Sequence, residues 1–139
     1  MKPITVTWDG GLRFTAEIRG HRLTVDQPEG QGGADAGPMP IELLPTSLGT
    51  CVALFVKQFL TTRDLDPTGL TVEVTAHGAA NPHRLGRLEV QVLIPGGVPE
   101  KYRDAVRRAA EGCTAHHTLT HTPEIALSIL EGASAARPA

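Results

Sequence analysis

The segment from Pro40 to Leu60 (PIELLPTSLGTCVALFVKQFL) constrains the fold more than any other part of the chain. Its apolar residues recur at steps of three and four, which is the spacing of one wide apolar face on an α-helix. The members of that face are Leu44, Leu48, Cys51, Phe55 and Phe59, with Val52 and Val56 beside them. Because many other residues of the segment are also apolar, we expect protein to surround this helix on most sides.

Prolines and a turn sequence set the predicted ends of this helix. Pro40 suits a first turn, where the missing amide proton has no helical partner. Pro45 lies one turn further along, and it predicts either a kink or a helix that begins near Thr46. The run DLDPTG at residues 64–69 predicts the end of the helix.

The rest of the chain alternates apolar and polar residues in short stretches, which predicts β-strands. Three strands should form an antiparallel meander before the helix, two more should pair after it, and one should close the chain. A second helix and a further helical turn should lie between the paired strands and the closing strand. Clustered strands of this kind predict the α+β class. The predicted strands are residues 3–8, 12–18, 22–26, 70–76, 87–94 and 124–130; the second helix is 98–112 and the helical turn is 114–120.

The length of 139 residues suits one domain, residues 1–139, with a substantial core. A stretch rich in Gly, Pro, Asp and Ala at about 27–39 predicts a mobile loop. Residues 132–139 are predicted to be a frayed tail. The hydrophobic content of 40% and the charged content of 20% are ordinary for a soluble globular protein.

Charge and composition argue against several classes of partner. A net charge of -2 gives no reason to expect nucleic acid, and 4% aromatic residues do not predict a base-stacking surface. We expect no membrane span, because no window has the necessary length and apolarity, and the N-terminus does not resemble a secretory signal. The default prediction is therefore a cytoplasmic protein.

The two cysteines, Cys51 and Cys113, lie far apart in the sequence and form no CxxC motif. In a reducing compartment they are either unrelated free thiols or a redox pair. A lone cysteine on an apolar helix face is usually core filling, and a reactive thiolate at Cys51 needs a nearby cation. The first three strands offer Arg13, Arg19 and Arg22, although an arginine on a strand is most often solvated.

Cys113 follows Gly112, the predicted end of the second helix. The carbonyl end of a helix disfavours a thiolate, so this position suits a resolving thiol better than an attacking one. The alternative is a partly buried free cysteine.

Each cysteine belongs to an ordered motif. The run Pro-x-Glu-Leu-Leu-x-x-x-Leu-Gly-x-Cys from Pro40 to Cys51 is similar to the central-helix signature of the OsmC/Ohr family. The segment from Cys113 to Leu119 (CTAHHTL), followed by Glu124 and Ile125, is similar to its second-cysteine signature. A Gly-rich meander that ends in Asp26-Gln27-Pro28 matches the usual N-terminal half. The resemblance covers nearly the whole chain.

The resemblance implies an OsmC-like fold in which antiparallel sheets pack around a long cysteine-bearing helix of an intertwined homodimer. It implies a thiol-dependent peroxidase that detoxifies organic hydroperoxides. Cys51 would become a sulfenic acid, Cys113 would condense with it to a disulfide, and an external thiol would reduce that disulfide. Glu42 would hold an arginine beside Cys51; Arg13 is the best match, with Arg19 behind it. No cofactor and no metal are implied.

An alternative function stays open: a non-enzymatic OsmC-like protein that binds a small apolar ligand and has unreactive cysteines. A zinc site at His116, His117 and His121 is a more distant possibility, because the HExxH pattern is missing. We expect these histidines to be polar surface residues beside a thiol.

Overall fold

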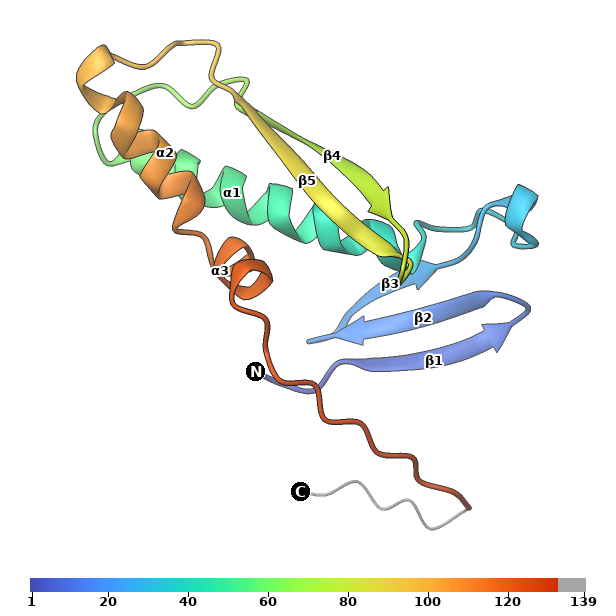
Figure 1. Cartoon of the computed structure of the whole chain (residues 1–139). Helices are drawn as coiled ribbons and strands as arrows, with labels where there is room; N and C mark the ends of the chain where they lie inside the picture. The colour runs from blue at the N-terminus through green and yellow to red at the C-terminus, as the bar shows by residue number, and fades with distance from the viewer. Residues whose placement is uncertain (133–139) are drawn as a thin grey trace.

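The computed structural model describes residues 1–132 and shows two separate antiparallel sheets and three α-helices (Figure 1). The predicted α+β class is confirmed. The strands are β1 (Thr5–Gly10), β2 (Arg13–Ile18), β3 (His21–Val25), β4 (Thr71–Ala79) and β5 (Arg84–Leu93). The helices are α1 (Leu43–Thr61), α2 (Arg103–Glu111) and α3 (Thr114–Thr120). Short 3-10 turns at Glu29–Gln31, Pro40–Glu42 and Glu100–Tyr102 complete the elements.

The N-terminal sheet has the order β1-β2-β3 and one apolar face. Val6 lies opposite Ala16, and Trp8 lies opposite Phe14, so these side chains share a face of the sheet. Val6 and Trp8 remain 61% and 65% exposed. A three-stranded sheet needs cover on its apolar face to be stable, so this face is incomplete within the single chain.

Asp26 fixes the loop that follows β3. Its side chain is 2% exposed, and its carboxylate accepts hydrogen bonds from the amides of Gln27 (2.8 Å), Ala34 (3.1 Å) and Ala36 (3.2 Å). These bonds, with that from Gln27 the strongest, lower the pKa of Asp26 despite its burial. The loop predicted to be mobile is therefore tied at several points to the end of β3.

Helix α1 begins at Leu43, directly after the turn Pro40–Glu42, so of the two predicted alternatives the later start near Thr46 is wrong. Pro45 is the third residue of α1. It therefore lies in the first turn, where backbone amides have no helical carbonyl to donate to, so the missing amide proton costs no hydrogen bond. The buried face of the helix packs against β4 and α2. The residues buried on that face are Leu48, Gly49, Val52, Val56 and Leu60.

The expectation that no segment reaches the length and apolarity of a membrane span was wrong. The 22 helical residues Pro40–Thr61 contain an 18-residue window with a mean hydropathy of 1.4. A core helix passes the same test of length and composition, and this helix carries the fold's central packing. Only 22% of its most apolar window is buried within the described chain, so much of its surface still lacks cover.

Strands β4 and β5 form a hairpin that is longer than predicted. Both strands extend into the predicted connection at residues 77–86, and only residues 80–83 separate them. Val72 pairs with Val92, and Val74 pairs with Val90. Because α1 packs against this hairpin, mainly against β4, the hairpin buries part of the helix surface (Figure 1).

The predicted closing strand at residues 124–130 was wrong for the described chain, where this segment forms no helix or strand. Its alternating apolar residues Ile125, Leu127 and Ile129 are 85%, 83% and 80% exposed. The pattern is that of a strand, but a strand forms only where another strand edge accepts its hydrogen bonds. Nearly all of the predicted tail, residues 132–139, lies outside the described residues.

Candidate functional site

The fold brings the two cysteines together beside the buried face of α1. Cys51 lies in the middle of α1 and is half-buried, whereas Cys113 lies between α2 and α3 and is fully buried. Cys51 packs against the same buried cluster that contains Cys113, and its side chain lies close enough to raise the pKa of the Cys113 thiol. Both cysteines are free thiols.

Cys113 is the N-cap of α3, a role that the sequence reasoning missed because it considered only the end of the preceding helix. Its sulfur accepts a hydrogen bond from the amide of His116 at 3.3 Å. Burial nevertheless dominates and raises the pKa of the Cys113 thiol, and the neighbouring Cys51 raises it further. Cys113 is therefore held as a protonated thiol beside Cys51.

The described chain does not bring Arg13 or Glu42 to the thiols through any hydrogen bond or ion pair. Arg13 opens β2, is exposed, and acts electrostatically on Asp26. Arg19, the second candidate, lies in the turn between β2 and β3 with a φ of 53°. Glu42 accepts a hydrogen bond from the amide of Met39 at 2.8 Å and so closes the turn before α1.

The histidines after Cys113 differ in their surroundings. His117 and His121 are exposed, as predicted, but His116 is half-buried, and its Nδ1 atom is buried without a hydrogen-bond partner among the described residues. Within residues 1–132, no group of three or more His, Cys, Asp or Glu side chains is placed to hold a metal ion. The signal in the sequence that could have located His116 was an N-cap at Cys113. The third residue after an N-cap donates its amide to the cap side chain, which holds His116 close to the buried Cys113.

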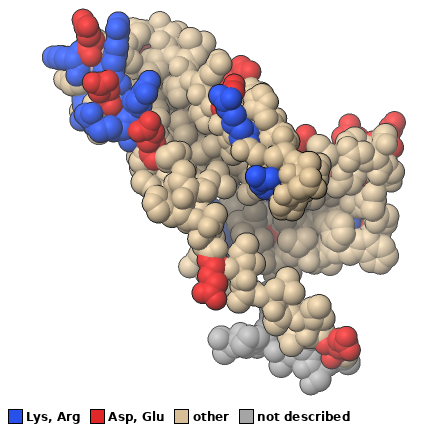
Figure 2. Space-filling view, viewed as in Figure 1, with Lys and Arg blue, Asp and Glu red and all other residues tan. Residues whose placement is uncertain are grey.

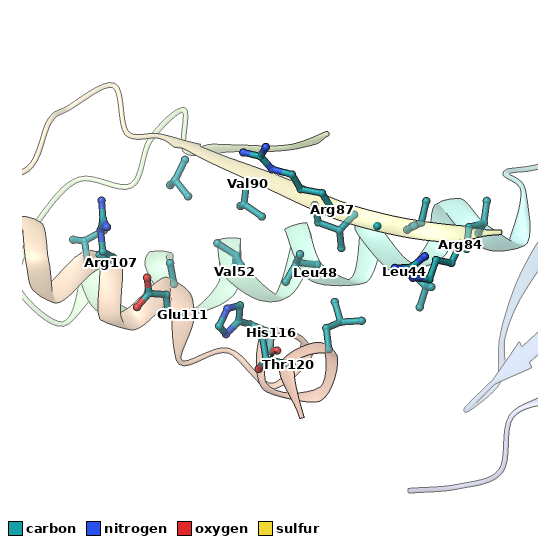
Figure 3. A pocket seen from close by; sticks show the side chains of 18 of the residues that line it. Leu44, Leu48, Val52, Arg84, Arg87, Val90, Arg107, Glu111, His116 and Thr120 are labelled. Atoms are coloured by element: carbon teal, nitrogen blue, oxygen red, sulfur yellow. Dashed lines mark hydrogen bonds between the residues drawn. The ribbon is translucent and has the colours of Figure 1, made fainter. Parts of the chain in front are cut away.

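A cavity of about 1070 Å³ lies between α1, β5, α2 and α3 (Figure 3). Its floor is apolar, and Leu44, Leu48 and Val52 of α1 form one side of it. Neither cysteine lines it, but His116 does, and in Figure 3 its ring lies beside Leu48 and Val52. The site therefore has two parts: a buried thiol pair and an apolar cavity next to it.

Comparisons with known proteins agree on one family. The family model described as OsmC-like protein matches residues 31–128, which is more than half of the chain. Among curated proteins the comparison found no match.

Solved structures of similar fold bear names from the same family. An osmotic stress induced and detoxification response protein of Psychrobacter arcticus has a TM-score of 0.76 and 25% identity, over 85% of this chain and 88% of that one. An organic hydroperoxide resistance protein of Legionella pneumophila has a TM-score of 0.60 and 18% identity, over 86% and 90%. A hydroperoxide resistance protein of Elizabethkingia anophelis has a TM-score of 0.62 and 22% identity, over 85% and 89%.

Proposed function

Because the chain belongs to the OsmC-like family, we propose that it is a thiol-dependent peroxidase that reduces organic hydroperoxides. The observation that carries this proposal is the close pair of Cys51 and Cys113, which the sequence places far apart and the fold brings together. Two relatives of similar fold are named as organic hydroperoxide resistance proteins, which supports the same chemistry.

The reaction begins at Cys51, which is half-buried and thus the more accessible of the two thiols. Its thiolate attacks the outer oxygen of the hydroperoxide, the O–O bond breaks, and the alkoxide takes a proton to leave as an alcohol. Cys51 is then a sulfenic acid. The Cys113 sulfur attacks that sulfenic acid, water leaves, and a disulfide forms. Two equivalents of an external thiol restore both cysteines.

The two thiols have different roles in this scheme because they differ in accessibility and in protonation. Cys113 is buried with a raised pKa, so it is a poor first nucleophile and is protected from the peroxide. Its contact with Cys51 suits it to the resolving step, in which the partner sulfur must be within reach. No metal or organic cofactor enters this scheme.

Activation of Cys51 needs a cation, and we propose that Arg13 of a second copy supplies it, held by Glu42. Within one chain Arg13 and Glu42 form no ion pair in the described residues, so this arrangement requires an assembly. A guanidinium beside the sulfur would stabilise the thiolate, and a carboxylate would fix the orientation of the guanidinium.

A homodimer would also cover the apolar surfaces that the single chain leaves open. These are the face of the N-terminal sheet with Val6 and Trp8, the segment 124–130, and part of α1. An alternating apolar segment can complete a sheet edge of a second chain, which would give residues 124–130 the hydrogen bonds that they lack here. Size-exclusion chromatography with light scattering tests this assembly, and a monomer at micromolar concentration would refute it.

A second candidate function is a small-ligand binding protein with unreactive thiols. The cavity of about 1070 Å³ favours it, since its volume and its apolar floor suit a ligand of moderate size. The two candidates differ in whether Cys51 reacts with peroxide.

Consumption of cumene hydroperoxide in the presence of dithiothreitol tests the peroxidase. Wild type should turn over, Cys51→Ser should be inactive, and Arg13→Gln should lose about tenfold or more through the loss of a charge-assisted contact. Arg19→Gln is the matched control on the same sheet and should keep its rate. Equal rates for wild type and Cys51→Ser would refute the proposal.

A further inference from the structure

The sulfur atom of Cys113 has two neighbours, and the reaction proposed above involves only one of them. It accepts a hydrogen bond from the amide of His116 at 3.3 Å and so caps α3, and the side chain of Cys51 lies close to it. Cys51 lies within the 19 residues of α1, whereas Cys113 lies in the short link between α2 and α3. One atom therefore connects the redox pair to the start of a helix.

Helix α3 has little intrinsic stability. It has only seven residues, and a helix of this length is unstable in water without outside support. Its sequence, TAHHTLT, contains three Thr and two His, which are poorer helix formers than Ala or Leu. The same sequence contains no Lys, Arg, Asp or Glu to form ion pairs between its turns, and Figure 2 shows uncharged surface where α3 lies, below the charged side chains of α2.

The support for α3 comes from packing against α1 and from its cap. None of the residues Thr114–Thr120 is fully buried, and Ala115 is only partly buried against the core cluster. The first amides of a helix have no helical carbonyl to donate to, and the sulfur of Cys113 satisfies the one at His116. The loss of an N-cap side chain typically changes the equilibrium between helix and coil by about fivefold. A helix as short as α3 should therefore depend on this contact.

Formation of the disulfide moves the sulfur that caps α3. In the proposed cycle the S–O bond of the Cys51 sulfenic acid breaks and the S–S bond to Cys113 forms, while the thiol proton leaves with the hydroxyl group as water. A disulfide holds its two sulfur atoms about 2.05 Å apart, which is closer than two free thiols approach each other. Because Cys51 is fixed within α1, most of this approach falls to Cys113, whose sulfur is drawn away from the amide of His116.

The buried position of Cys113 also makes the disulfide hard to reduce while α3 stays in place. An external thiolate must attack one of the two sulfur atoms, and Cys113 is fully buried. Attack at Cys51 makes Cys113 the leaving group, and a buried thiol with a raised pKa leaves slowly. Contact of Cys113 with water would remove both obstacles.

We propose that α3 is a redox-sensitive latch. It is closed over Cys113 while the cysteines are free, and it loosens when the disulfide between Cys51 and Cys113 removes its cap, so that an external thiol can reach the disulfide. Reduction by two equivalents of that thiol frees Cys113 to cap α3 again. This proposal rests on the proposed function, because the peroxidase cycle is what forms the disulfide.

Hydrogen–deuterium exchange of the amides of α3, measured by mass spectrometry, tests the latch. We compare reduced protein with protein treated with cumene hydroperoxide and with protein treated with diamide, which oxidises a thiol pair directly without peroxidase chemistry. The amides of α3 should exchange about fivefold faster in the disulfide form, and those of α2 should not change. If only diamide forms the disulfide, the peroxidase proposal fails, while the exchange of α3 still decides the latch. Equal exchange of α3 in the reduced and disulfide forms overturns the latch, as does failure of both oxidants to link the cysteines.

Two substitutions of Cys113 separate its role as a cap from its role in the disulfide. Cys113→Ser keeps a capping side chain but cannot form the disulfide, so its α3 should exchange slowly both before and after oxidant. Cys113→Ala removes both, so its α3 should exchange about fivefold faster than that of Cys113→Ser without any oxidant. The exchange of α2 in each variant reports any change that is not confined to α3. If α3 exchanges equally in the two variants, the cap does not hold this helix, and the proposal is overturned.

Discussion

Gly49 sets how closely α1 approaches the hairpin, and its replacement by alanine tests this directly. Gly49 is buried two residues before Cys51, on the face of α1 that meets β4. A Cβ atom at this position would lie 3.0 Å from Cγ2 of Val74 and 3.9 Å from Cγ1 of Val72. The first distance is shorter than an ordinary van der Waals contact between carbon atoms, so Val74 or the helix must move.

Two opposing terms set the size of the effect. Alanine in a helix interior is favoured over glycine by about 1 kcal/mol. An overpacked methyl group in a core costs typically about 2 kcal/mol. Gly49→Ala should therefore lower the free energy of unfolding by about 1 kcal/mol. Because Val74→Ala removes the clashing methyl, Gly49→Ala in that background should instead raise the free energy of unfolding by about 1 kcal/mol.

Urea unfolding followed by circular dichroism measures all four proteins of this cycle at one protein concentration. The expected coupling between the two positions is about 2 kcal/mol. If Gly49→Ala stabilises the wild-type protein as much as it stabilises the Val74→Ala variant, contact between the new methyl group and Val74 does not limit how closely α1 approaches the hairpin.

Three further perturbations follow from the structure. Leu60→Ala, at a side chain that is 0% exposed, should lower the free energy of unfolding by about 2–5 kcal/mol, and thermal melts of wild type and variant with equal midpoints would contradict this. Asp26→Asn should lower the free energy of unfolding at neutral pH. The difference between variant and wild type should shrink as pH falls below about 3.9, the pKa of an unfolded Asp, because the ionised carboxylate stabilises the fold only while it stays deprotonated. Wild type should lose stability relative to Cys113→Ser as pH rises above about 8.5, because the thiol of Cys113 ionises at lower pH in the unfolded chain than in the folded one. Urea midpoints of the two proteins that run parallel across this pH range would refute this.

The sequence was sufficient to predict the elements whose pattern is local. The periodicity around Cys51 predicted α1, and strict alternation predicted the meander and the hairpin. Pro45 misled the prediction of where α1 begins. A proline is tolerated anywhere in the first turn of a helix, and the 3-10 turn at Pro40–Glu42 lets α1 begin at Leu43, before Pro45. The ends of β4 and β5 were missed because pairing across the hairpin overrides the polar character of residues 77–86.

The candidate site depended on relations that a linear pattern does not contain. The resemblance to a family paired Cys51 with Cys113, but only the fold shows that Cys113 caps the N-terminus of α3 and that burial raises its pKa. His116 looked like a surface histidine until the turn of α3 placed its ring in the cavity. Residues 124–130 have the right pattern for a strand, yet they pair with no strand in the described chain, and the proposed homodimer would supply the missing edge.

Mass spectrometry of the reduced protein after a brief, near-stoichiometric dose of cumene hydroperoxide tests the central claim most directly. Wild type should lose the mass of two hydrogen atoms and yield a peptide pair linked through Cys51 and Cys113. Cys113→Ser should instead gain one oxygen atom at Cys51, and Cys51→Ser should keep its remaining thiol. If wild type and both variants keep their thiols intact under this dose, the two cysteines are not a peroxidatic pair, and the peroxidase proposal is refuted.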